Sequence, residues 1–158
     1  MVGVGDLWSE SESLTLRLSG VWIVSALVGH THFDADEQDA FWDGVTDAAL
    51  RAEGLARRIL VDMAADRAWL FDEFKLDDRP IVSGLNAVVR LLDRADAVEA
   101  YRVRSTLLGL GQSFARARGP FGRRMTREDE QTLVLVEQLL QPDSTTASDN
   151  PLNSDLPI

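Results

Sequence analysis

The chain turns between two apolar helical segments at residues 29–38, which read Gly29-His30-Thr31-His32-Phe33-Asp34-Ala35-Asp36-Glu37-Gln38. In the second half of this elbow, Asp34 and Glu37 have the spacing of a capping box, in which each side chain accepts a hydrogen bond from a free backbone amide at a helix start. The first half, from His30 to His32, contains both histidines of the protein. The elbow therefore predicts a break between two helices, with polar side chains gathered at the break.

Helical patterns extend on both sides of the elbow. Before it, Ser9 and Glu12 have capping-box spacing again, and the residues that follow predict a helix to about residue 28 with one broad apolar face. Asp77-Asp78-Arg79-Pro80 predicts a turn, with the proline at the first position of the next helix. Helical patterns also cover approximately residues 35–52, 55–63, 66–75, 80–92, 97–117 and 127–140.

Helical patterns dominate the sequence, and the alternation of apolar and polar residues that is typical of strands is hard to find in it. We therefore predict an all-α, single-domain bundle of about six or seven helices. Gly20, Gly109 and Gly111 lie inside predicted helices, where glycine is unfavourable and suggests close approach of a neighbouring helix.

The loop before the last predicted helix resembles the elbow. Each loop has an apolar residue, a capping residue directly after it and an acid three positions later, namely Phe33, Asp34 and Glu37 in the elbow and Met125, Thr126 and Asp129 in the second loop. Both loops have to start a helix and bury one side chain behind its N-terminus. We therefore predict two pseudo-equivalent helix-loop-helix units, in which residues 14–50 superpose on about 100–140.

The composition bounds the organisation of the chain. Its 158 residues, of which 45% are apolar, suffice for one core, and the composition becomes rich in Ser, Thr, Asp, Asn and Pro after residue 141. We expect an N-terminal extension over residues 1–8, one helical domain over 9–141 and a flexible acidic tail over 142–158. The protein has no cysteine, which excludes disulfides, thiolate metal sites and cysteine nucleophiles.

Charge and hydropathy limit the expected compartment and partners. The N-terminal segment carries acids where a signal peptide would carry positive charge, and the longest apolar run, residues 20–28, is too short to span a bilayer. We expect a cytoplasmic protein without membrane insertion. The net charge of -10 repels phosphate, so nucleic acid is not an expected partner.

Two stretches resemble the TerB-like tellurite-resistance family, an all-helical family whose loops tend to read Ala-Asp-Gly shortly before the capping residue. Residues 26–41 are similar to its first helix-loop-helix unit. Residues 101–140 are similar to its last unit, and the matching positions are Tyr101, Ala115, Ala117, Gly119 to Gly122, Met125, Thr126 and Asp129. The resemblance implies a non-catalytic binding or scaffold module in bacterial stress, tellurite or metal resistance, with protein partners. It leaves a homodimer open.

The chain departs from the family pattern in both loops. His30 and Thr31 stand where the family has aspartate and glycine, and Arg118, Arg123 and Arg124 stand where it often has small or acidic residues. The resemblance implies acidic loops that bind a divalent cation, and these departures leave that implication only half supported.

The elbow carries a metal hypothesis. Its candidate ligands for a divalent metal ion are His30, His32, Asp34, Asp36 and Glu37. Imidazole together with carboxylate suits zinc, nickel or copper better than magnesium or calcium. In the alternative interpretation the histidines are solvated and Asp34 only caps the helix. A divalent-metal-binding protein, or a metal-dependent enzyme built on this site, is the alternative function.

A basic segment near the second loop carries an anion hypothesis. The candidate residues for binding an anion or an acidic partner segment are Arg116, Arg118, Arg123, Arg124 and Arg127. Arginine forks and the free amides of a helix start both favour negative charge. In the alternative interpretation these arginines only offset the acidic remainder of the chain.

The remaining patterns have structural explanations that compete with functional ones. Four aspartates in the second predicted helix suggest calcium binding or, at their helical spacing, a solvated face: Asp36, Asp39, Asp43 and Asp47. Trp69, Phe71 and Phe74 suggest a ligand pocket or a part of the core. No serine-histidine-aspartate order and no phosphate-binding glycine loop is recognisable, so we do not expect an enzyme.

Overall fold

The computed structural model describes residues 8–118 and 125–142, with the side chain of Arg118 excepted. This part of the chain contains seven α-helices and no strand, which confirms the predicted all-α bundle. The helices are α2 (Glu10–Val28), α3 (Ala35–Arg51), α4 (Gly54–Ala65), α5 (Leu70–Leu76), α6 (Ile81–Leu92), α7 (Ala97–Arg118) and α8 (Arg127–Leu140). None of these helices is long and apolar enough to cross a membrane.

The helix starts follow the predicted caps. Ser9 Oγ accepts from the Glu12 amide at 3.2 Å, and Glu12 Oε1 accepts from the Ser9 amide at 2.9 Å. Asp34 and Glu37 make the same reciprocal pair at the start of α3, at 2.8 and 3.0 Å. Thr126 Oγ1 accepts from the Asp129 amide at 3.0 Å and begins α8. The superposition of the two predicted units stays a prediction.

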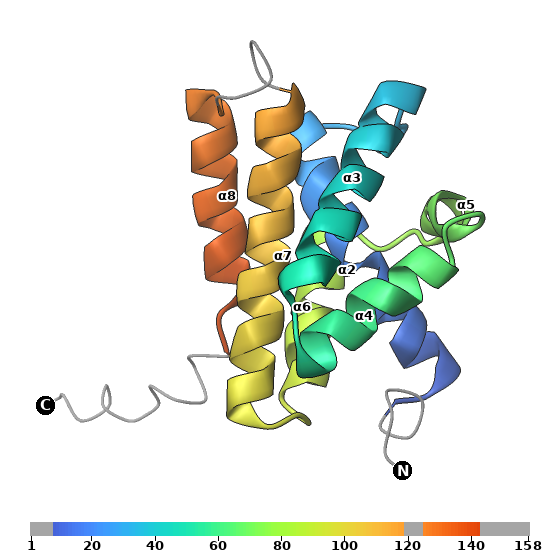
Figure 1. Cartoon of the computed structure of the whole chain (residues 1–158), viewed down its shortest axis with the longest axis vertical. Helices are drawn as coiled ribbons and strands as arrows, with labels where there is room; N and C mark the ends of the chain where they lie inside the picture. Colours follow the sequence, from blue (N-terminus) through green and yellow to red (C-terminus); the bar gives the residue numbers. More distant parts are fainter. Residues whose placement is uncertain (1–7, 119–124, 143–158) are drawn as a thin grey trace, which may run out of the picture.

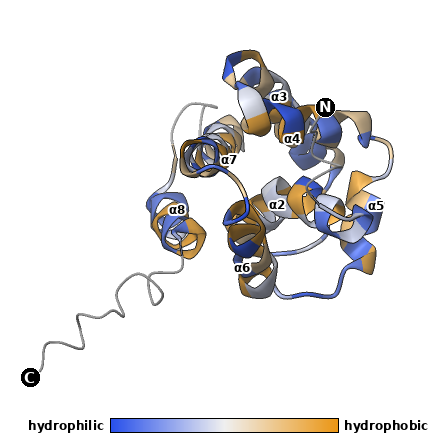
Figure 2. Ribbon diagram, turned by 90° about the horizontal axis from the view of Figure 1, so that it is seen from below, coloured by the Kyte–Doolittle hydropathy of each residue, from blue (hydrophilic) through white to orange (hydrophobic). Residues whose placement is uncertain are grey.

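α2 is the central helix of the bundle. Seen along the bundle, it lies among α4, α5, α6 and α7, while α8 packs on the outside against α6 and α7 (Figure 2). Every residue from 18 to 25 is buried, on all sides of the helix. The expectation of one broad apolar face was therefore wrong. The sequence does contain a signal for burial on all sides, because residues 18–29 include no charged side chain.

Glycines let α7 and α2 approach each other closely. A Cβ atom at Gly20 of α2 would lie 2.8 Å from Leu110 Cδ2 of α7, and one at Gly111 of α7 would lie 2.9 Å from Ile23 Cγ2 of α2. These two predicted close approaches are confirmed. The prediction for Gly109 was wrong, because a Cβ there would meet no atom of a neighbouring described helix within 4 Å. Figure 1 shows α7 running beside α3 and antiparallel to α8.

The aromatic residues around α5 belong to the core, apart from one. Phe71 and Phe74 are buried, whereas Trp69 is 63% exposed and precedes the helix. Phe33 of the elbow packs on Phe71 with ring centroids 5.2 Å apart. This contact fixes the elbow against α5. Helix α5 is shorter than the predicted 66–75 because residues 66–69 form turns instead.

Two further expectations are corrected at residue level. Trp8 is 3% exposed and its Nε1 donates to the Leu91 carbonyl oxygen at 3.3 Å, so it belongs to the packed domain and not to an extension. Pro80, which was predicted at the first helical position, is instead the N-cap of α6, and the helix begins one position later at Ile81. Residues 1–7 and 143–158 of the predicted extension and tail lie outside the described residues.

The acidic face of α3 is solvated, as the second interpretation of that pattern holds. The four aspartates for which calcium binding or a solvated face was considered are all exposed, namely Asp36, Asp39, Asp43 and Asp47. Asp47 also pairs with Arg51 one helical turn later. The charge of Asp47 is therefore balanced by the Arg51 guanidinium.

Candidate functional site

The carboxylates of the elbow are occupied by the start of α3. Asp34 and Glu37 each accept a backbone amide in the capping box. His30 Nε2 lies 3.6 Å from the other oxygen of Glu37, and the two form a partly exposed pair. The elbow backbone is fixed as well, since Ser25 Oγ donates to the His30 carbonyl oxygen at 2.8 Å.

The structure does not bring the five predicted metal ligands together. Asp36 is exposed on α3, and His32 borders a different surface from the one that His30 shares with Glu37. Among residues 8–118 and 125–142, no three His, Asp or Glu side chains form a group that could hold a metal ion. Within this part of the chain, His30 and Glu37 remain as a pair and not as a site.

The predicted arginine site lies partly outside the described residues. Arg123, Arg124 and the side chain of Arg118 belong to that part. Arg116 and Arg127 are both exposed, one near the end of α7 and the other at the start of α8. The side chain of Thr126 already satisfies one amide of that helix start. The anion hypothesis for this segment therefore stays a prediction.

A different surface has the shape of a site. Two hollows meet at the segment between α5 and α6 and share Asp77, Asp78 and Arg79 in their linings, and we call them together the Arg79 cleft. The Arg94 hollow, of about 710 Å³, lies between the first turns of α2 and the end of α6. The His32 hollow, of about 580 Å³, lies between the elbow, the end of α5 and the start of α6.

Arg79 is held from three directions. Its Nε and Nη2 donate to the Asp77 carboxylate, at 3.1 Å to Oδ1 and 2.7 Å to Oδ2. Its Nη2 also donates to Thr15 Oγ1 at 3.1 Å, and its guanidinium lies 5.0 Å from the centre of the Trp22 ring. The hydrogen bonds from Arg79 hold the pKa of Asp77 below its usual value. The wall between the two hollows is therefore a fixed ion pair.

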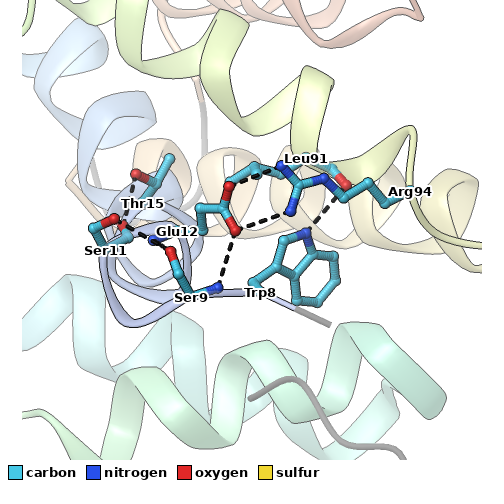
Figure 3. A network of polar contacts seen from close by, with 7 residues as sticks. All are labelled: Trp8, Ser9, Ser11, Glu12, Thr15, Leu91 and Arg94. Atoms are coloured by element: carbon cyan, nitrogen blue, oxygen red, sulfur yellow. Dashed lines mark hydrogen bonds and ion pairs between the residues drawn. The ribbon is translucent and has the colours of Figure 1, made fainter. Parts of the chain in front are cut away.

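The Arg94 hollow has a second fork of the same kind. Arg94 Nη1 and Nη2 donate to the two oxygens of Glu12 at 2.9 and 2.8 Å. Figure 3 shows this fork beside the capping box of Ser9 and the indole of Trp8, which donates to Leu91. The hydrogen bonds from Arg94, with that from Ser9, lower the pKa of Glu12 to about 2. One carboxylate thus starts α2 and also fixes the end of α6.

This cleft was not predicted from the sequence. Glu12 was predicted as part of a cap, which is correct, and Asp77 to Pro80 as a turn, whereas these residues form an irregular connection between α5 and α6. The second role of Glu12 depends on Arg94, a residue 82 positions later in the chain. Local spacing carries no signal for such a contact.

A carboxyl pair lies near α5, away from the cleft lining. Arg17 Nε lies 3.3 Å from Asp66 Oδ2, and Glu73 Oε1 is buried without a hydrogen-bond partner in the part of the chain that the structure describes. The pKa of Glu73 is raised to about 7, first because the protonated side chain donates to Asp66 and second because burial penalises its charge. As a carboxylate Glu73 cannot donate, which explains why the buried oxygen has no partner in that state.

Comparisons of the chain with protein-family models, with curated protein sequences and with solved structures find no match.

Proposed function

We propose that this protein is a non-catalytic binding module whose ligand surface is the Arg79 cleft. The observation that carries this proposal is the state of the two paired carboxylates in the cleft. Glu12 and Asp77 are each held by an arginine fork that lowers the carboxyl pKa. General acid–base catalysis is most effective when the pKa lies near the working pH. Carboxylates that stay ionised and paired favour a surface that recognises ligands over one that transfers protons.

The size and chemistry of the cleft support the same conclusion. Both hollows fall within the range of about 300 to 1,000 Å³ that is typical of small-molecule sites. Each combines apolar side chains with hydroxyl and charged groups, such as Leu76 and Arg90 in the Arg94 hollow and Phe74 and Lys75 in the His32 hollow. The net charge of -10 disfavours nucleic acid as the ligand, and a small molecule or a protein segment is the ligand we propose.

The biological setting of the proposal is bacterial stress, tellurite or metal resistance. It rests only on the resemblance of residues 26–41 and 101–140 to the TerB-like family. The binding-module proposal does not depend on it, because the argument from Glu12 and Asp77 uses the cleft alone.

The proposal is tested by a fragment screen on the ¹⁵N-labelled full chain, with amide chemical shifts as the readout. We expect hits to shift amides in residues 11–15, 75–81 and 87–94, which border the cleft. Arg79→Lys keeps the positive charge but loses the fork to Asp77. It should weaken the hits roughly tenfold, as expected for a hydrogen bond to a charged group.

Arg57→Lys is the matched control, because Arg57 is exposed on α4 outside the cleft lining. The compounds that bind the wild type should bind Arg57→Lys with the same affinity. Hits that gather on another surface, or that are indifferent to Arg79→Lys, would refute the cleft as the ligand surface. Conversion of a bound compound into a new species would contradict the non-catalytic part of the proposal.

A further inference from the structure

We propose that the His32 hollow binds an anionic group, a carboxylate or a phosphate, that is carried on an apolar body. This inference rests on the proposed function, since it names the ligand class for one half of the Arg79 cleft. It draws on the start of α6, on the buried indole of Trp22 and on the cations at the rim.

The start of α6 offers free backbone amides to the hollow. Pro80 and Ile81 border it, and no side chain of the described residues caps this helix start. The first turn of α6 contains no acid. The first amides of a helix have no acceptor within the helix, and together with the helix dipole they favour negative charge.

Trp22 is an independent sign of a missing acceptor. Its side chain borders the same hollow, the residue is 1% exposed, and its buried Nε1 has no hydrogen-bond partner among residues 8–118 and 125–142. The indole lies against the first turns of α6, because a Cβ at Gly84 would come 2.3 Å from Trp22 Cε2. Most buried donors in native proteins have a partner. An unpartnered donor beside a helix start indicates a ligand that supplies an acceptor.

Cationic and polar side chains of the rim add to the attraction. Lys75 is exposed and forms no ion pair with the described residues. His32 and Thr31 border the hollow from the elbow and offer an imidazole and a hydroxyl group. The hydrogen bonds of Arg79 to described residues use Nε and Nη2, so within this part of the chain Nη1 is available to a ligand.

The acids of the hollow oppose an anion only in part. Asp77 is balanced by the fork from Arg79, whereas Asp78 is exposed and has no ion pair to the described residues. An anion is therefore expected on the side of Lys75 and the start of α6. Trp22, Phe74 and Ile81 supply an apolar lining for the rest of the ligand.

The test titrates the ¹⁵N-labelled full chain with phenyl phosphate, benzoate, inorganic phosphate and the neutral analogue benzamide. The indole signal of Trp22, assigned by its loss in Trp22→Phe, and the amide of Ile81 report on the hollow. We expect both aromatic anions to shift these signals and to bind roughly tenfold more tightly than benzamide. Inorganic phosphate should bind more weakly than phenyl phosphate because it lacks the apolar body. Stronger binding of phenyl phosphate or of benzoate identifies the phosphate or the carboxylate as the preferred source of charge.

Variants locate the site. Lys75→Ala should weaken binding of the anions roughly fivefold to tenfold, and His32→Ala should weaken it by a smaller factor. Arg57→Ala, an exposed change outside the hollow, should leave it unaltered. Equal affinity for benzoate and benzamide, or anion binding indifferent to Lys75→Ala, would overturn the anion inference and leave the binding-module proposal standing. Absence of binding in both hollows, here and in the fragment screen, would overturn both.

Discussion

Replacing Glu73 by glutamine tests the carboxyl pair of Asp66 and Glu73. Glu73 lies on α5. Its side chain can form a hydrogen bond with Asp66 only when it is protonated and donates to the Asp66 carboxylate. Arg17 of α2 attenuates the effect and Glu10 adds to it, because their charges lower and raise the pKa of Glu73. A glutamine amide can donate to Asp66 at every pH. The variant should therefore behave like the protonated wild type.

The sign of the effect follows from the raised pKa. Glu73 has a pKa of about 7 in the folded protein against an ordinary value of 4.5, so the folded state holds the proton more tightly. The stability that this proton contributes is fully present below pH 4.5 and is lost as the pH rises through 7. For a fully buried group the loss would be about 3 kcal/mol. We expect about 1 to 2 kcal/mol, because Glu73 is partly exposed and solvent screens its charge.

The assay is urea unfolding at pH 5 and pH 8, compared between the wild type and Glu73→Gln. The free energy of unfolding of the wild type should fall by about 1 to 2 kcal/mol more than that of the variant over this interval. Asp72→Asn, which changes an exposed carboxylate of the same helix, should keep the pH dependence of the wild type. The lowered pKa of Glu12 does not interfere, since its contribution is lost only as the pH falls towards 2.

Substitution of Asp66, the partner of Glu73, should also change the pH dependence of stability. Asp66→Asn removes the negative charge that favours protonated Glu73, and its amide can donate to the Glu73 carboxylate, so it should reduce the pH dependence as well. The direct observable is the side-chain carboxyl ¹³C signal of Glu73, which should titrate near pH 7 in the wild type. An equal pH dependence in wild type and Glu73→Gln, or titration of Glu73 near 4.5, would refute the proton shared between these carboxyls.

Three further predictions concern packing, and each is measured by urea unfolding. Gly84→Ala should destabilise the protein by about 1 to 3 kcal/mol, because its Cβ would lie 2.3 Å from the rigid ring of Trp22. An unchanged midpoint would contradict that contact. Gly109→Ala should instead stabilise it by about 0.5 to 1 kcal/mol, since open space surrounds its Cβ position; destabilisation would show that the space is filled. Trp8→Ala should cost about 3 to 5 kcal/mol, because the buried indole also donates to Leu91. A loss of unfolding free energy below about 1 kcal/mol would indicate that Trp8 belongs to an N-terminal extension and not to the core.

The boundaries of the helices were predictable where a local pattern sets them. Capping boxes use residues three positions apart, so the starts of α2 and α3 could be assigned from Ser9 and Asp34 alone. The start of α6 was predicted within one residue for the same reason, because Pro80 acts on its own backbone. The start of α5 was predicted too early, since Trp69 continues the apolar spacing of the helix but lies on the surface.

The position of α2 in the bundle was harder to predict. A helix that is buried on all sides has no periodic contrast between faces, and the amphipathic pattern is the usual signal. Here the signal was the absence of charge between Arg17 and the elbow. The Arg79 cleft could not be predicted, because it forms between segments that are far apart in the sequence, and its ion pair of Glu12 with Arg94 joins residues 82 positions apart. No local sequence pattern around Arg94 indicates its partner, and only the fold places it beside Glu12.

The elbow of residues 29–38 is held both by local contacts within the loop and by a contact with a distant helix. Asp34 and Glu37 are committed to starting α3, and the contact of Phe33 with Phe71 fixes the loop against α5. Thr31 and His32 precede these anchors, border the His32 hollow and make no hydrogen bond or ion pair to the described residues. The contacts that hold the loop are therefore made by other residues, and His32→Ala should change the free energy of unfolding by less than about 0.5 kcal/mol. An effect of His32→Ala on anion binding would then be an effect on the ligand itself, because the fold of the elbow does not depend on the imidazole.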